Sequence, residues 1–275
     1  MTEKVRGRLL IIGGHEDKKH DKLILRKMVE FAGGERAHVV ICTVASTDQE
    51  ETGEEYRRLF LELGVARAEI LRIHDRLDAL RFQAGDWFTK ATGLFFTGGD
   101  QLRITSTLGG TPLSRQIRRL YEQGVLLAGT SAGAAAMSDI MIVGGDGTES
   151  PRLEQTYVAP GMGYLEEVII DQHFNQRGRI SRLLGVLAQN PFVLGLGIDE
   201  DTAVYVQEDG TAEVYGSGTV TILDASRATT TNASRVDPAE ALAIADVRLH
   251  VLPSGYRFQL EERVVLHSGK AHSAH

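Results

Sequence analysis

Short apolar runs alternate with amphipathic segments through the first two hundred residues of the chain. Buried strands are expected at RLLIIGG, HVVICTVA, AEILRI, GLFFTGGD, VLLAGTS, EVIIDQHF and VLGLGIDE. Helical spacing of apolar residues occurs between them, in KLILRKMVEF, EEYRRLFLELG, PLSRQIRRLYEQG and RISRLLGVLAQ. This alternation predicts βαβ units and an α/β fold with a mostly parallel sheet.

The pattern changes from about Ala203 onward. The segment AVYVQEDGTAEVYGSGTVTILDAS alternates apolar and polar residues and contains the turn sequences EDG and GSG, which predicts an antiparallel meander. We expect this meander to extend the edge of the same sheet. We therefore predict one domain over residues 1–275, with a core at about 9–265 and a disordered tail at 266–275.

Composition narrows the possible partners and compartments. The 275 residues carry a net charge of −7 and form no Lys/Arg block, which argues against nucleic acid as a partner. Cys42 is the only cysteine and lies in a predicted buried strand, so it is expected to be a small core residue. Only four apolar residues precede Gly13 in the first strand, too few for a signal peptide or a membrane span, so we expect a cytoplasmic protein.

Ser131 stands at a predicted strand-to-helix turn among very small residues. It lies in AGTSAGAAAMSD, where Gly129, Ala132 and Gly133 leave room for a tight backbone. A serine in such a nucleophile elbow presents its hydroxyl at the start of the helix, where the N–H of Ala132 could hold an oxyanion. The alternative is a closely packed turn in which Ser131 only caps the helix.

Two further segments supply partners for a nucleophilic serine. His173 follows a predicted strand directly and is a candidate general base at the same sheet edge as Ser131. Asp199, Glu200 and Asp201 share one turn, and any of the three could orient the imidazole. The chain order of serine, histidine and carboxylate disfavours a lipase or esterase of the α/β-hydrolase fold.

Five motifs, taken in order, resemble the cyanophycinases, which are serine hydrolases that degrade multi-L-arginyl-poly-L-aspartate. They are GGHEDK (13–18), FFTGGDQLR (95–103), LAGTSAGAAAMS (127–138), DQHFNQRGRISRLL (171–184) and GLGIDEDTA (195–203). The resemblance runs from about residue 9 to about residue 265. It implies a flavodoxin-like three-layer sandwich, shared with the aspartyl dipeptidases and the class I glutamine amidotransferases, and a homodimer.

The resemblance also assigns roles to individual residues. It implies Ser131 as the nucleophile, His173 as the general base and Glu200 as the residue that orients the base. We expect the backbone N–H groups of Gly99 and Ala132 to form the oxyanion hole. The family's substrate pocket corresponds to Gln101, Asp171, Gln172, Arg177, Arg179 and Arg182. His15 is a departure, since some relatives carry alanine there.

The arginines at the start of the segment RISRLLGVLA support this pocket on physical grounds. Arg179 and Arg182 lie one turn apart on the polar face of the predicted helix. Cations near a helix N-terminus oppose its dipole unless an anion is bound, and a substrate carboxylate would supply one. The alternative is a solvated basic face.

The expected reaction is hydrolysis of the polymer at β-aspartyl backbone bonds, through an acyl-enzyme on Ser131, to release β-Asp-Arg. No cofactor and no metal are expected, since the chain contains no HEXXH pattern. Two alternatives remain. One is an aspartyl dipeptidase that uses the same triad on small dipeptides, and the other is a catalytically silent, amidotransferase-like binding protein.

Overall fold

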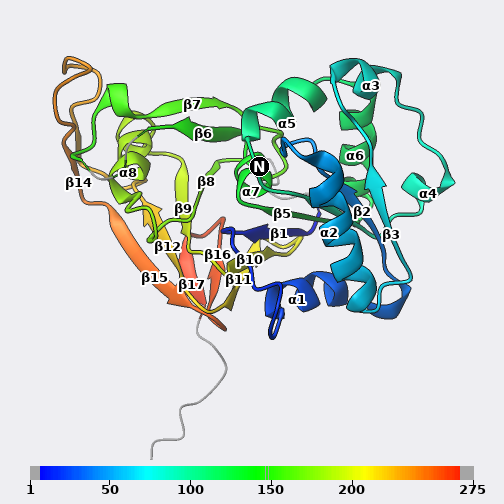
Figure 1. Cartoon of the computed structure of the whole chain (residues 1–275). Helices are drawn as coiled ribbons and strands as arrows, with labels where there is room; N and C mark the ends of the chain where they lie inside the picture. The colour runs from blue at the N-terminus through cyan, green and yellow to red at the C-terminus, as the bar shows by residue number, and fades with distance from the viewer. Residues whose placement is uncertain (1–6, 146, 148, 267–275) are drawn as a thin grey trace, which may run out of the picture.

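A computed structural model describes residues 7–145, 147 and 149–266 of the chain. Its largest sheet, the central sheet, has the strand order β17-β16-β11-β10-β1-β5-β4-β2-β3 (Figure 1). In chain order its strands are β1 (Leu9–Ile12), β2 (His38–Cys42), β3 (Arg67–Leu71), β4 (Gly93–Phe96), β5 (Leu126–Thr130), β10 (Thr202–Val206), β11 (Thr211–Gly216), β16 (Arg257–Gln259) and β17 (Val264–Leu266). The strands from β1 to β3 in this order are parallel, and the other four join antiparallel. The predicted α/β class with a mostly parallel core and antiparallel strands is confirmed.

Helices cover both faces of the parallel strands. On one face, α1 and α2 bury Leu25 and Phe60 against the sheet. On the other face, α3, α5, α6 and α7 contribute residues such as Ile104 and Ile117. The helix bounds are α1 (Leu23–Phe31), α2 (Gln49–Glu62), α3 (Arg76–Arg81), α4 (Asp86–Thr89), α5 (Gln101–Leu108), α6 (Pro112–Glu122), α7 (Ala132–Ala135) and α8 (Ile180–Gln189). The arrangement is the three-layer sandwich that the resemblance implied.

Local sequence explains where α6 begins and which side it buries. The Thr111 side chain accepts a hydrogen bond from the backbone N–H of Ser114, and Pro112 occupies the first helical turn. Leu113, Ile117 and Leu120 recur at helical spacing and are buried. The amphipathic segment therefore folds as the sequence predicted.

The strand order places β1 in the interior of the central sheet. The parallel strands follow the order β3-β2-β4-β5-β1. In flavodoxin-like sheets the order is 2-1-3-4-5, and β2, β3, β4 and β5 occupy its positions 1 to 4. The fifth position is taken by β1, the first strand of the chain. β1 consequently lies between β5, its parallel neighbour, and β10, its antiparallel neighbour. Segments that are far apart in the sequence meet at the carboxyl end of β1.

A second sheet, which lies on the left in Figure 1, corrects the prediction of a single sheet. It has the order β15-β12-β9-β8, with β8 (Val168–Gln172), β9 (Leu194–Ile198), β12 (Thr219–Asp224) and β15 (Arg248–Pro253). β8 and β9 were expected in the parallel sheet, and β12 was expected at its edge. Val220 and Ile222 of β12 pack toward the central sheet, whereas Leu223 packs with α8, so this strand is buried on both faces.

Short elements complete the described chain. β6 (Ile140–Gly144) pairs with β7 (Tyr157–Pro160), β13 (Thr230–Thr231) pairs with β14 (Ile244–Ala245), and single 3₁₀ turns occur at Gly34–Arg36 and Leu153–Gln155. Leu266, which was assigned to a disordered tail, ends strand β17, and residues 267–275 lie outside the described part. None of the described helices is long and apolar enough to cross a membrane. The one-domain assignment stays a prediction.

Candidate active site

Three consecutive carbonyls at the end of β1 hold the three candidate catalytic segments together. The N–H of Ser131 donates to the carbonyl of Ile12 at 3.0 Å, and the N–H of His173 donates to that of Gly13 at 2.9 Å. The N–H of Asp201, next to Glu200, donates to the carbonyl of Gly14 at 2.9 Å. His173 leaves the second sheet rather than the central one, and these hydrogen bonds bring it to Ser131.

Ser131 has the strained backbone of a nucleophile elbow. Its φ of 52° and ψ of −111° lie outside the usual regions for a residue with a side chain. A Cβ on Gly129 would lie 2.6 Å from the carbonyl carbon of Gly133, and one on Gly133 would lie 2.4 Å from the Phe96 carbonyl oxygen. Glycine is therefore required at both positions, as the sequence pattern predicted.

Ser131, His173 and Glu200 form a continuous chain of hydrogen bonds. The Oγ of Ser131 lies 2.9 Å from Nε2 of His173, and Nδ1 of His173 lies 2.7 Å from Oε1 of Glu200. Because an ionised carboxylate can only accept, Nδ1 of His173 carries the proton and Nε2 is free to accept from the serine hydroxyl. This is the geometry of a serine–histidine–carboxylate triad.

Glu200 alone of the three neighbouring carboxylates contacts His173. Asp199 is buried and accepts hydrogen bonds from Asn175 and Thr219. Asp201 accepts instead from the backbone N–H of Asp17 and from the hydroxyl of Ser217. The residues alone had left the choice among the three carboxylates open. The structure brings Glu200, the one that the resemblance implied, into contact with His173.

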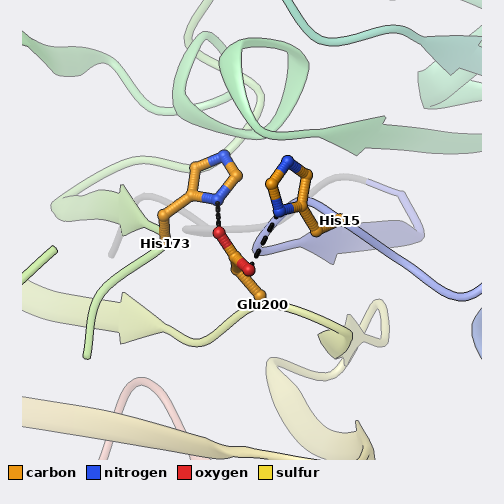
Figure 2. A group of neighbouring side chains, drawn as sticks. All are labelled: His15, His173 and Glu200. Carbon is orange, nitrogen blue, oxygen red and sulfur yellow. Dashed lines mark hydrogen bonds and ion pairs between the residues drawn. The ribbon is translucent and has the colours of Figure 1, made fainter. Parts of the chain in front are cut away.

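His15 makes a second contact to the same carboxylate. Its Nδ1 lies 2.9 Å from Oε2 of Glu200, and its ring stands edge-on to that of His173, with the ring centroids 5.1 Å apart (Figure 2). The His15 side chain is 72% exposed, whereas that of His173 is 4% exposed. Glu200 thus accepts hydrogen bonds from two imidazoles, one buried and one open to solvent.

The environment of His173 favours the neutral imidazole that a general base requires. Burial lowers the pKa of His173 below its usual 6.5, the hydrogen bond that His173 donates to Glu200 opposes this change, and the charge of Arg177 adds to it. Burial alone would raise the pKa of Glu200, but hydrogen bonds from His173 and His15 hold it below its usual value. At neutral pH the triad therefore contains a neutral imidazole and an ionised carboxylate.

The pKa of His173 predicts the acid limb of the pH profile. Hydrolysis requires neutral His173, so kcat/KM should fall as the pH drops through a midpoint below 6.5 and should approach a plateau at higher pH. The measurement is kcat/KM on a soluble oligomer of β-Asp-Arg from pH 4.5 to pH 8.5, with unfolding followed over the same range. A midpoint above 6.5 in the folded protein would contradict this assignment of the base.

A pocket of about 350 Å³ opens at the triad. It is lined by His15, Glu16, Lys18, Tyr56, Gly98, Gly99, Thr130, Ser131, His173 and Arg177. A larger hollow of about 560 Å³ lies against β3, but no serine, cysteine or histidine of the described chain lines it. The smaller pocket is consequently the candidate active site.

The six predicted substrate-binding residues are divided by the structure. Arg177 lines the pocket beside Ser131. The other five do not line it, among the described residues, and the Gln101 side chain donates to the Ile142 carbonyl at 2.7 Å. Substrate binding by these residues stays a prediction.

Asp171 is an anion within the chain that pairs with both arginines of the predicted pair. Its carboxylate, 1% exposed, accepts from Nε of Arg182 at 2.7 Å and also pairs with the terminal nitrogen of Arg182. Arg179 lies 3.4 Å from the same carboxylate and donates to Gln172. The two arginines thus share one carboxylate within the chain, which offsets one of their two positive charges.

The predicted oxyanion hole has one member in the pocket wall. Gly99 lines the pocket, and its φ of 139° suits glycine because a Cβ there would lie 2.1 Å from the Ala45 carbonyl oxygen. Ala132 follows Ser131 at the first position of α7 and is buried. The assignment of both N–H groups to an oxyanion hole stays a prediction.

One cluster of side chains could in principle hold a metal ion. His15, His173 and Glu200 each offer a ligand atom, and these atoms lie within 4.8 Å of one another. Both imidazoles already donate to Glu200, so an ion bound there would break the hydrogen bond that orients His173. The expectation of a reaction without metal stays a prediction.

Sequence reasoning did not single out Glu16, Lys18 or Tyr56, which also line the pocket. Glu16 and Lys18 belong to the GGHEDK motif directly after the first strand. Ligand sites in α/β sheets lie beyond the carboxyl ends of strands, and that rule applied to every polar residue of the motif would have found both. Tyr56 reaches the pocket from α2, which no local signal indicates.

Comparison with known proteins shows the family. The model of Peptidase family S51 matches residues 9–214, which include Ser131, His173 and Glu200. The cyanophycinase of Geminocystis herdmanii is 42% identical over 259 residues, which cover 94% of this chain and 95% of the relative. The cyanophycinase of Trichormus variabilis is 43% identical over 259 residues, which cover 94% and 87% of the two chains.

Two solved structures share the fold. A peptidase from an acI-B1 Actinobacterium superposes with a TM-score of 0.66 at 23% identity, over 94% of this chain and 99% of the other. A putative peptidase E protein from Listeria monocytogenes superposes with a TM-score of 0.52 at 18% identity, over 77% and 99%. The family match and the identity to the relatives lead to one conclusion: the chain belongs to peptidase family S51 and is a serine peptidase.

Proposed function

We propose that this peptidase hydrolyses cyanophycin, multi-L-arginyl-poly-L-aspartate, and releases β-Asp-Arg from a chain end as an exopeptidase. The observation that carries the proposal is the aligned triad of Ser131, His173 and Glu200, in a chain 42% identical to a cyanophycinase. The product β-Asp-Arg keeps the bond between the aspartate β-carboxyl and arginine. The bond that breaks is therefore the backbone amide that joins successive β-Asp-Arg units, which corrects the expectation of cleavage at a β-aspartyl bond.

Each triad member has a role in this reaction. The Ser131 hydroxyl gives its proton to Nε2 of His173 as its oxygen attacks the carbonyl carbon of the scissile amide. The Glu200 carboxylate stabilises the imidazolium that forms, and the N–H groups of Gly99 and Ala132 hold the oxyanion. His173 then protonates the leaving amine, and water releases the acyl group from Ser131 by the same steps in reverse.

The two alternatives are less well supported. A silent binding protein would not need the strained backbone of Ser131 or a base within hydrogen-bond distance of its hydroxyl. A dipeptidase would use the same triad, but the relatives at 42–43% identity are named cyanophycinases. A homodimer is proposed from the family resemblance, and a cytoplasmic location from the composition.

The direct experiment is incubation of the purified protein with insoluble arginine–aspartate polymer, followed by mass spectrometry of the soluble fraction. We expect β-Asp-Arg to accumulate, and protein pretreated with a fluorophosphonate should release none. Intact polymer combined with cleavage of free aspartyl dipeptides would replace this proposal with the dipeptidase. Intact polymer without fluorophosphonate labelling would favour the silent protein.

A further inference from the structure

Glu16 is a buried carboxylate in the wall of the pocket that contains Ser131. It follows β1 by four residues, and it is 5% exposed. The triad makes no use of it, since His173 is oriented by Glu200. A buried acidic group beside a nucleophile needs an explanation, because removing a carboxylate from water is unfavourable unless a partner compensates.

The partners of Glu16 within the chain are neutral hydroxyls. The Tyr56 hydroxyl donates to Oε1 at 2.5 Å, and the Thr130 hydroxyl donates to Oε2 at 2.6 Å. Both carboxyl oxygens of Glu16 therefore accept, as those of a carboxylate do. Burial, and after it the charge of Glu16, raises the pKa of Tyr56 well above its usual value, so Tyr56 stays a neutral donor.

No cation of the described chain pairs with Glu16. Lys18 lines the same pocket, but its Nζ pairs with Glu55 at 2.9 Å and lies 4.1 Å from the centre of the Tyr56 ring. The negative charge of Glu16 is consequently left for a ligand to neutralise. A cation that enters the pocket would gain a pairing that the protein itself does not satisfy.

We propose that Glu16 binds the guanidinium of the substrate's arginine side chain and so selects arginine-bearing units. This inference rests on the proposed function. Each Glu16 oxygen accepts from one hydroxyl and keeps a second acceptor direction, and two parallel N–H groups of a guanidinium match that pair. Because Thr130 directly precedes Ser131, its hydrogen bond fixes the Glu16 carboxylate beside the nucleophile.

The charges in the pocket suit both ends of a β-Asp-Arg unit. Such a unit carries the arginine guanidinium and the free arginine carboxylate. Glu16 supplies the negative group, and Arg177, exposed in the same pocket wall, supplies a positive one. The pocket of about 350 Å³ is of the size that holds a small ligand.

The test compares two soluble oligomers, β-Asp-Arg and β-Asp-citrulline, because citrulline has the shape of arginine without its charge. We expect wild-type kcat/KM to favour the arginine oligomer by about 100-fold, as for a buried charged pair. Glu16→Gln should lose about 100-fold on the arginine oligomer, mainly through KM, and change little on the citrulline oligomer. Glu54→Gln is the matched control. It also removes one negative charge, but from an exposed ion pair with Arg57 on α2.

The outcomes separate failure of this inference from failure of the proposed function. Equal wild-type rates on the two oligomers would overturn the role of Glu16 and leave the peptidase intact, and this result does not depend on whether the variant folds. Equal losses on both oligomers in Glu16→Gln would show a structural role and overturn it as well. If the wild type cleaves neither oligomer and no polymer, the proposed function fails and the inference fails with it.

Discussion

Replacement of Ser131 by alanine should abolish polymer hydrolysis, with kcat lower by on the order of 10⁶-fold. The Oγ of Ser131 lies 2.9 Å from Nε2 of His173 and is the atom that would form the acyl-enzyme. Without it, the pocket can only assist direct attack by water, which leaves a small residual rate. The rate of β-Asp-Arg release, measured by mass spectrometry over hours to days, gives the magnitude.

The Ser131→Ala protein should fold normally. Alanine keeps the Cβ that already exists at this position, so the backbone strain at φ 52° does not change. Its melting temperature should stay within a few degrees of the wild-type value, and fluorophosphonate labelling should disappear. Ser106→Ala, an exposed serine on α5, is the matched control and should keep full activity. A folded Ser131→Ala protein within ten-fold of wild type would exclude Ser131 as the nucleophile.

The local pattern of the sequence predicted the positions of the parallel strands of the central sheet and of the longer helices that cover it. Strands buried on both faces, such as β2 and β5, have nearly continuous apolar sequences. In amphipathic helices such as α6, the helical spacing of the apolar residues identifies the buried face. These signals depend on burial and spacing within one segment. They do not depend on which other segment supplies the hydrogen bonds.

Sheet membership depends on those partners, and it was the part that the sequence did not reveal. The run at β8 is as completely buried as that at β5, yet β8 pairs with β9 in a different sheet. Nothing in VIIDQ distinguishes the two environments, because strand pairing joins residues far apart in the chain. The functional prediction survived this error because the N–H of His173 still reaches the Gly13 carbonyl.

The candidate site was predictable to different degrees. Ser131 could be found from its glycine and alanine neighbours, since the elbow excludes larger side chains. The choice of Glu200 over Asp199 and Asp201 could not be made from the residues. Asp201 has a positive φ of 45°, so the backbone of this turn is irregular. The three consecutive carboxylates consequently point to different partners. The role of His15 at Glu200 could not be seen either, because it depends on where two loops meet.

The Glu200→Gln variant is the second change with a large expected effect. A carboxylate can accept from His173 and His15 at once, whereas an amide offers one acceptor and one donor group. An amide N–H that faces His173 would force the proton onto Nε2, which could then no longer accept the proton of Ser131. We expect kcat to fall by about 10³- to 10⁴-fold, with little change in KM.

A comparison with His15→Asn separates the two imidazoles that share Glu200. Asparagine tolerates the positive φ of 48° at this position and keeps a side-chain N–H near the place of Nδ1. Since His173 keeps its carboxylate partner in this variant, we expect kcat to fall by less than ten-fold. Both variants should still fold, which thermal unfolding would check. If Glu200→Gln retained more than a tenth of wild-type kcat, orientation of His173 by a carboxylate would not limit the reaction, and the serine–histidine pair alone would account for catalysis.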